Sequence, residues 1–282
     1  MEGYVFLDID NLAVAWETYC GRLVSVEESS SNGRIPMSSW FASRIQQDRT
    51  WLRNEAIMEM TRRINYPSQI SRLRGMYFFE DKRTAIRASL EWNGRRFKLD
   101  RLAKVKFSSD SKITKVDHNW ILDNMENHID HNNQPEWIHQ YWQGKTTGRK
   151  PFWELIVKGK AVILETELQK KAYETIRQKQ PSTLRLLEIS RIAWDMGYHF
   201  GHIAAWLVKE PSNSFFEIKY TFDANDANDD EFINKFHQYQ GPKNIQDLNA
   251  SEDIFKPDLR NEFFQFVPTE DELSLLFSVL QN

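Results

Sequence analysis

Residues 71–79, SRLRGMYFF, and residues 151–163, PFWELIVKGKAVI, are the two stretches that decide the fold of this 282-residue chain. The first contains a short apolar run that follows Gly75, and the second holds two apolar runs joined by Lys158-Gly159-Lys160. Short apolar runs bounded by glycine or polar residues are typical of strands, and a basic link that contains glycine is typical of a turn. The two stretches therefore predict one strand and, further along, a strand-turn-strand unit.

The same short apolar runs occur in the rest of the first half of the chain. Further strands are expected at residues 4–9 and 101–107. Apolar residues at helical spacing predict a helix over residues 51–64, which Tyr66-Pro67 ends, and a second helix over residues 83–92. This mixture of strands and helices indicates an α+β fold.

The pattern changes after Glu165. Helices are predicted at residues 167–178, 182–195 and 199–208, with shorter helical pieces after Asp229 and after Thr269. Ser182 has a good N-capping side chain and follows Pro181, so we expect it to cap the second of these helices. We therefore divide the chain into residues 1–165 and a mostly α-helical region over residues 166–282.

Composition limits the class of protein. The chain is 40% hydrophobic and 27% charged and carries 18 Phe, 10 Trp and 9 Tyr, which is far more aromatic surface than a disordered chain has. Cys20 is the single cysteine, so no intramolecular disulfide can form. The sequence shows neither a signal-peptide pattern nor a run of about 18 apolar residues, so we expect a cytoplasmic protein that makes no use of a membrane.

The net charge of -3 is unevenly distributed along the chain. Residues 211–282 hold 5 Lys and Arg against 14 Asp and Glu, a net charge of -9, which leaves +6 for residues 1–210. The basic part is compatible with a polyanionic ligand, and the acidic part with a basic partner. A solvated surface on both parts is the alternative.

The stretch Gly75-Met76-Tyr77-Phe78 resembles a strand of the ADP-ribosyltransferases, in the branch that contains diphtheria toxin and the poly(ADP-ribose) polymerases. In that branch, a Gly-aliphatic-Tyr-Phe strand leads through a short loop into a helix that begins with small residues, and Ala85 lies in such a helical run here. The Tyr of the family stacks on the nicotinamide ring of NAD, so the resemblance implies this role for Tyr77. A flat aromatic face suits a flat, electron-poor ring.

Residues 151–163 resemble the strand-turn-strand of the same families, in which a Glu enters the first apolar strand. The match falls on Glu154, and the resemblance implies that Glu154 is the catalytic carboxylate. Cleavage of a glycosidic bond places positive charge on the sugar carbon, and a fixed anion stabilises that transition state more than the ground state. Together the two segments imply an ADP-ribosyltransferase-like split β-sandwich with flanking helices, and NAD as the co-substrate.

The first motif of the family is missing. It is a His or Arg on the opening strand that holds the NAD ribose, and residues 4–11 contain neither. Arg22, Arg34 or Arg72 are alternative donors. Tyr77, Arg72, Ser71, Gly75 and Arg34 are therefore the candidate NAD-binding residues. If no donor reaches NAD, the fold can be correct and the activity absent.

A loop before Glu154 has the composition of an acceptor-binding surface. Members that modify protein side chains often carry Glu or Gln two residues before the catalytic Glu, and Phe152 stands there, which argues against an arginine-modifying enzyme. Cationic and stacking side chains of the kind that hold single-stranded nucleic acid are interleaved here. The candidate acceptor-binding residues are Trp142, Lys145, Arg149, Lys150 and Trp153. A solvated loop is the alternative.

No metal site is expected. His118, His128, His131 and His139 form the densest histidine cluster, but their spacing matches no zinc motif.

The function expected on this resemblance is a mono-ADP-ribosyltransferase toxin of a toxin-antitoxin or phage-defence system. It would transfer ADP-ribose to a nucleic acid, with RNA favoured, or to a protein. A neutralising antitoxin protein is the expected partner, and the aromatic residues Phe255, Phe263, Phe264 and Phe266 are its candidate docking surface within the accessory region. A non-catalytic adaptor that kept the fold, and an enzyme similar to RNA 2'-phosphotransferases, are the alternatives.

Overall fold

The structure is a computed structural model. It describes residues 1–26, 34–47, 50–92, 97–127, 129–130, 134–209, 215–249, 253–262, 264–267 and 269–270, together with Glu272 and Leu275.

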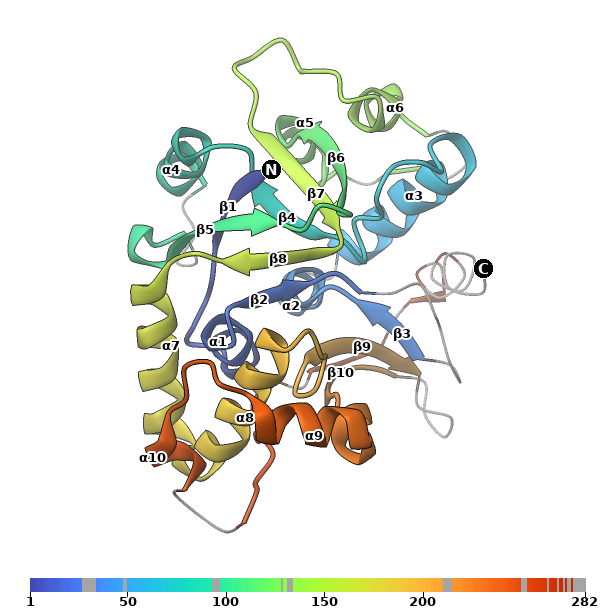
Figure 1. Ribbon diagram of the computed structural model, residues 1–282. Coiled ribbons are helices and arrows are strands. Elements are labelled where there is room, and N and C mark those ends of the chain that lie inside the picture. The colour runs from blue at the N-terminus through green and yellow to red at the C-terminus, as the bar shows by residue number, and fades with distance from the viewer. Residues whose placement is uncertain are drawn as a thin grey trace.

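The described strands form two antiparallel sheets (Figure 1). Sheet A has the order β2-β8-β5-β1-β4-β7-β6, and sheet B has the order β11-β10-β9-β3. The strands of sheet A are β1 (Glu2–Phe6), β2 (Arg22–Val24), β4 (Met76–Phe79), β5 (Leu102–Phe107), β6 (Lys112–Asp117), β7 (Trp153–Lys158) and β8 (Lys160–Ile163). Those of sheet B are β3 (Arg34–Met37), β9 (Ile203–Lys209), β10 (Phe216–Phe222) and β11 (Phe264–Phe266).

The helices lie around the two sheets. Those of the first 165 residues are α1 (Leu12–Tyr19), α2 (Ser39–Gln47), α3 (Thr50–Asn65), α4 (Lys82–Glu91), α5 (Asn119–Asn124) and α6 (Glu136–Trp142). The later ones are α7 (Thr166–Lys179), α8 (Leu184–Asp195), α9 (Asp230–Gln238) and α10 (Ile245–Leu248). In Figure 1, α5 and α6 lie above sheet A, and α8, α9 and α10 lie below it.

Sheet A has a buried core on each face, because successive side chains of a strand point to opposite sides. Tyr77 and Ile156 belong to the core that includes α3, α6 and most of sheet B. Phe78 and Leu155, one residue away on the same strands, belong to the core that includes α1, α7 and α8. The central strands β4 and β7 are therefore apolar on both faces, which is why they appear in the sequence as continuous apolar runs.

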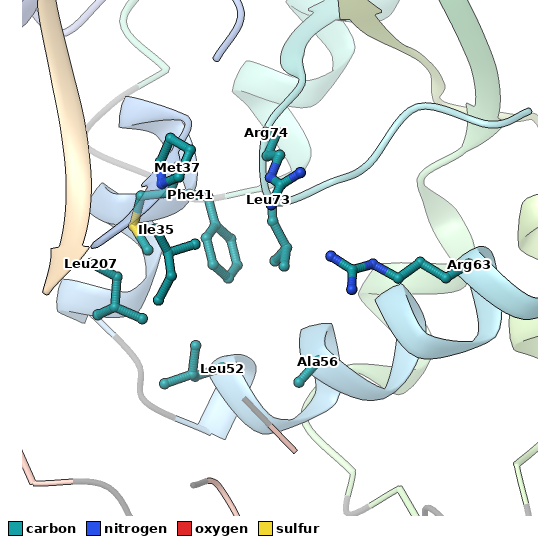
Figure 2. A pocket seen from close by; sticks show the side chains of 10 residues that line it. Ile35, Met37, Phe41, Leu52, Ala56, Arg63, Leu73, Arg74 and Leu207 are labelled. Carbon is teal, nitrogen blue, oxygen red and sulfur yellow. The ribbon is translucent and has the colours of Figure 1, made fainter. Parts of the chain in front are cut away.

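A small apolar gap separates sheet B from α3. It has a volume of about 20 Å³ and lies among Ile35, Phe41, Leu52 and Leu207, as Figure 2 shows. This is about the room that one water molecule needs, and the lining is apolar except for Arg63 and Arg74 at one side. The gap is therefore a packing defect and not a ligand site.

The sequence predicted most of these elements correctly. The strands expected around residues 4–9, 75–79, 101–107 and 152–164 are confirmed, as are the helices expected over 51–64, 83–92, 167–178, 182–195 and after Asp229. Asp81 caps α4, because its side chain accepts a hydrogen bond from the Thr84 amide at 2.8 Å. Most residues after Thr269, where a further helix was expected, lie outside the described residues.

Two expectations for the second half are wrong. Residues 203–209 form strand β9 and not a helix, and β10 and β11 pair beside it, so the region combines a sheet with its helices. Ser182 lies inside a 3₁₀ turn, and Thr183 is the N-cap of α8, without a side-chain hydrogen bond. Sheet B also joins β3 to β9, with Ile35 opposite Leu207, so it unites strands from both sides of residue 165. The domain division at that residue stays a prediction.

The burial of β9 gives a testable prediction about sheet B. Leu207 is 1% exposed between β3 and the core, so Leu207→Ala should lower the free energy of unfolding by about 2–5 kcal/mol. The matched control Leu122→Ala removes the same atoms from a side chain that is 42% exposed. It should change the free energy of unfolding by no more than about 0.5 kcal/mol. Urea denaturation measures both. Equal effects would contradict the described packing of sheet B.

Candidate active site

Tyr77 and Glu154 lie on neighbouring strands and on the same face of sheet A. In the β4–β7 pair, Tyr77 is opposite Ile156 and Phe79 is opposite Glu154. Opposed residues share a face, and so do residues two apart on one strand. The exposed fractions of Tyr77 and Glu154 are 7% and 5%. The two residues that carry the family resemblance are thus close together, and both are buried.

Arg72 connects them. Its guanidinium group lies with Cζ 5.2 Å from the centre of the Tyr77 ring, and its Nη1 donates to Glu154 Oε2 at 3.3 Å. Nε and Nη2 donate to the Glu55 carboxylate on α3 at 2.9–3.0 Å, and Nη1 also donates to the Tyr141 hydroxyl. The Tyr77 hydroxyl donates to the Arg72 carbonyl oxygen. A buried guanidinium needs such partners, because an unpaired buried charge is strongly destabilising.

Glu154 is held as an anion. His118 Nδ1 lies 3.2 Å from Glu154 Oε2, which is the same oxygen that accepts from Arg72 Nη1. Burial by itself would raise the pKa of Glu154, but the charges and hydrogen bonds of His118 and Arg72 outweigh it and hold the pKa below the ordinary 4.5. An ionised carboxylate can stabilise positive charge that develops near it.

An aromatic wall surrounds His118. The Trp92 ring lies over it with a centroid distance of 4.5 Å and an interplanar angle of 30°. Phe152 lies 5.1 Å from the Trp92 ring, and the Arg87 guanidinium is 3.6 Å from the centre of the Phe152 ring. Phe152, two residues before Glu154, therefore contributes to packing.

A cavity of about 410 Å³ lies between sheet A and sheet B, and Tyr77 is part of its wall. The Trp40 ring is 6.2 Å from the Tyr77 ring at an interplanar angle of 37°, so two aromatic faces meet at this wall. Glu154 is not among the lining residues. In this conformation the carboxylate does not open onto the cavity.

The cavity is acidic. Four carboxylates line it, and no Lys or Arg is among the described residues that do so; the carboxylates belong to Asp8, Asp10, Glu17 and Glu262. Asp8 and Asp10 pair with Arg101, and Glu17 pairs with Arg22. A cation or a group rich in hydroxyls suits such a lining better than a phosphate does.

Three other residues expected to bind NAD, Ser71, Arg72 and Gly75, are not among the residues that line the cavity beside Tyr77. Arg72 was expected to donate to NAD, but its donors are taken by Glu55, Glu154 and Tyr141, so it positions Glu154 instead. Ser71 and Gly75 line a different cavity, of about 380 Å³. Arg34 begins β3, and its side chain lies outside the described residues.

Gly75 has a steric role. A Cβ at this position would lie 2.4 Å from Ile156 Cγ2 and 2.9 Å from the Ser71 carbonyl oxygen. Only glycine allows β4 to approach β7 this closely.

Like Arg72, the alternative donor Arg22 is engaged by a carboxylate of the protein itself. The Arg22 side chain is fully buried, and its Nε lies 2.9 Å from Glu17 Oε2. The Glu17 carboxylate also accepts a hydrogen bond from the Ile203 amide. It therefore stabilises the contact between α1 and sheet B and does not reach the cavity as a free donor.

The acceptor loop is partly as expected. Lys145, Arg149 and Lys150 are exposed, so the loop presents positive charge. The expected role of Trp142 is wrong, because its ring is fully buried and its Nε1 donates to the Met58 carbonyl oxygen at 3.1 Å. Trp153 is partly exposed, with a lysine, Lys115, 4.4 Å from its ring.

The buried carboxylate of Asp117 fixes both ends of this loop. It accepts from the Thr147 amide at 3.2 Å and from the Phe152 amide at 3.0 Å. Asp117 therefore fixes the position of this loop, which carries exposed cationic side chains directly before β7. Its contact with a nucleic acid stays a prediction.

Sequence reasoning missed Glu55, His118 and Tyr141 as members of the site. Glu55 could have been found, because it lies three residues from both Leu52 and Met58 on the apolar face of a predicted helix, where a carboxylate needs a partner. His118 was considered only as part of a metal cluster. His128 and His131 lie outside the described residues, His139 contacts Tyr66, and the described residues hold no group arranged as a metal site.

The carboxy-terminal aromatic residues do not form one surface. Phe264 and Phe266 belong to β11, and Phe266 is 5% exposed. Phe255 is 48% exposed, and Phe263 lies outside the described residues. Phe264 and Phe266 are thus part of sheet B and pack in or against its core, which corrects the expectation of four docking aromatics.

Comparison with known proteins places the chain in one family. Residues 26–172 match the family described as "Protein of unknown function (DUF2441)", and the match covers more than half of the chain. The chain therefore belongs to this family. A comparison with curated proteins gives no match. Among the described residues, no helix has the length and apolar character needed to cross a membrane.

The acidic lining gives a prediction about pH. Burial alone would raise the pKa of Glu17, but Arg22 and His202 lower it to about 2 from the ordinary 4.5. Because the pKa is lower in the folded state, the carboxylate stabilises the fold above pH 4.5, and this contribution is lost as the pH falls toward 2. Glu17→Gln should therefore cost on the order of 3 kcal/mol at pH 7.

The gap between wild type and Glu17→Gln should close below pH 4.5, as measured by denaturant unfolding over a pH series. Glu91→Gln is the control, since the Glu91 side chain is 54% exposed, and it should show no comparable pH-dependent gap. A gap for Glu17→Gln that stays constant down to about pH 3 would rule out the assigned titration.

Proposed function

We propose that this protein is an NAD-dependent mono-ADP-ribosyltransferase in which Glu154 is the catalytic carboxylate and Tyr77 stacks on nicotinamide. The observation that carries the proposal is the placement of both side chains on one face of β4 and β7, bridged by Arg72. The finer description of the fold, an ADP-ribosyltransferase-like split β-sandwich, is part of the same proposal. It is supported by two antiparallel sheets with a cavity between them.

The chemistry needs an anion beside the ribose. The glycosidic bond breaks, nicotinamide leaves with the bonding electron pair, and positive charge develops on the ribose carbon. A nucleophilic atom of the acceptor then bonds to that carbon and releases its proton to solvent. Glu154, kept ionised by His118 and Arg72, would lower the energy of the charged state. His118 and Arg72 act as positioning residues for that carboxylate.

The cavity suits one end of NAD. The nicotinamide ring of NAD carries a positive charge, so carboxylates and the aromatic faces of Trp40 and Tyr77 attract it. The pyrophosphate finds no cation in the described lining and must be held elsewhere. Glu154 does not line the cavity, so NAD in the cavity would not reach it in this conformation. The proposal therefore includes a rearrangement on NAD binding, in which the Trp40 and Tyr77 rings separate.

The acceptor in this proposal is a nucleic acid, with RNA favoured over protein. The exposed cations Lys145, Arg149 and Lys150 lie in the loop that Asp117 fixes before β7, and Phe152 leaves no acid or amide for a protein acceptor. A cytoplasmic toxin of a toxin-antitoxin or phage-defence system, with a neutralising protein partner, is the corresponding biological role.

A non-catalytic protein is the second candidate, and one observation favours it. Glu154 is 5% exposed and is held between Arg72 and His118, as in a structural ion-pair network. Such a network orients elements without any chemistry.

NAD turnover separates the two candidates. Wild-type protein should release nicotinamide from NAD and transfer labelled ADP-ribose to RNA, and Glu154→Gln, which keeps the shape of the side chain, should reduce both rates about 100-fold or more. Tyr77→Ala should raise KM for NAD. The control Glu91→Gln changes a side chain that is far more exposed than that of Glu154, and it should leave both rates unchanged. Thermal denaturation checks that each variant is folded.

Transfer that survives in a folded Glu154→Gln variant would remove Glu154 from catalysis. Absence of nicotinamide release by the wild type with RNA, DNA and protein acceptors would favour the non-catalytic candidate.

A further inference from the structure

A histidine in the wall of the cavity between the two sheets has no part in the proposed reaction. His202 lies immediately before β9, and it lines the cavity of about 410 Å³ together with Glu17 of α1. A cavity of this size is within the range of small-molecule sites. The imidazole of His202 is therefore placed where it can contact a ligand.

The backbone around His202 is held in one place. The Asp223 amide donates to the His202 carbonyl oxygen at 2.8 Å. The indole of Trp16 donates to the Gly201 carbonyl oxygen at 3.0 Å. Gly201 has a φ of 79°, and a Cβ there would collide with Ser190 Oγ, so only glycine fits. These contacts fix the point from which the imidazole reaches the cavity.

One ring nitrogen of His202 is committed to a carboxylate. His202 Nδ1 lies 3.1 Å from Glu17 Oε2. Burial by itself would raise the pKa of Glu17, but Arg22 and His202 lower it to about 2, so the carboxylate is ionised and can only accept a hydrogen bond. Nδ1 must therefore carry the proton. In a neutral imidazole, the other nitrogen, Nε2, is then a hydrogen-bond acceptor.

Nε2 of His202 is available to a ligand. The side chain is 17% exposed, and within the described part of the chain Nε2 has no hydrogen-bond partner and is not enclosed by other atoms. A nitrogen lone pair in this state recognises a donor, which is a hydroxyl or an N–H group.

The rest of the lining favours a sugar hydroxyl as that donor. Trp40 and Tyr77 present aromatic faces at the cavity wall, and such faces suit a flat heterocycle. The hydroxyl groups of Ser39 and Ser43 also line the cavity, while no Lys or Arg does so among the described residues. Aromatic faces beside groups that accept from hydroxyls match the two parts of a nucleoside, its base and its ribose.

We infer that His202 Nε2 accepts a hydrogen bond from a ribose hydroxyl of a nucleoside bound in this cavity. Glu17 is a positioning residue, because it fixes the ring and its tautomer. The inference deepens the proposed function and rests on it for the identity of the nucleoside, which is the nicotinamide riboside part of NAD.

Two substitutions separate contact with the ligand from support of the fold. A glutamine amide reaches about as far as imidazole Nε2, and an asparagine amide about as far as Nδ1. His202→Gln should therefore keep the ligand contact and lose the contact with Glu17, and His202→Asn should do the reverse. By calorimetric titration, His202→Asn should raise Kd for NAD about tenfold, as expected for one lost hydrogen bond, and His202→Gln less than about threefold. His202→Gln should have the lower melting temperature of the two.

Nicotinamide and an exposed histidine provide the controls. Nicotinamide has no ribose, so it should bind to wild type and to His202→Asn with the same Kd. His237 is an exposed histidine on α9 and does not line the cavity, so His237→Asn should change Kd for NAD by less than about twofold.

Equal Kd values of wild type and folded His202→Asn for NAD would overturn the inference and leave the proposed function standing. So would a His202→Gln variant that binds NAD more weakly than His202→Asn, since a purely structural role gives that order. A Kd for nicotinamide that rises as much as that for NAD would overturn the assignment to ribose. A wild type that binds neither NAD nor nicotinamide riboside would remove the proposed function together with this inference.

Discussion

The buried guanidinium of Arg72 is the constraint on which the rest of the structure depends. It is 4% exposed, and a charge at such a depth is tolerated only with anionic or polar partners. Those partners come from three different elements, Glu55 of α3, Glu154 of β7 and Tyr141 of α6. The requirement to satisfy one side chain thus fixes how α3 and α6 lie on this face of sheet A.

The same constraint shapes the candidate site. Arg72 and His118 keep Glu154 ionised, and Arg72 also lies over the Tyr77 ring, so the two residues are coupled through one cation. This arrangement stabilises the core, and in the proposed function it also supplies the catalytic anion. The cavity that Tyr77 lines holds four carboxylates, and Val26 lines both this cavity and the one beside Ser71 and Gly75.

The sequence predicted the parts of the fold that local pattern determines, such as the strand at Tyr77 and the strand-turn-strand around Glu154. It failed at residues 203–209, where Ala204 and Ala205 favour a helix and an apolar run does not distinguish a helix from a strand. Pairing with β3 and β10 decides the outcome, and both partners are far away in the sequence. For the site, the sequence could not show that His118 meets Glu154 or that Trp142 turns inward, because both depend on tertiary packing.

The most direct test of the account is an intermolecular NOE measurement between bound NAD and protein selectively labelled in its tyrosine rings, with Tyr77→Phe used to identify the signal. The account predicts cross-peaks from the Tyr77 ring to protons of the nicotinamide and its ribose. Cross-peaks that join NAD only to other tyrosines, or no binding of NAD at all, would contradict the placement of Tyr77 and Glu154 at the reacting end of the co-substrate.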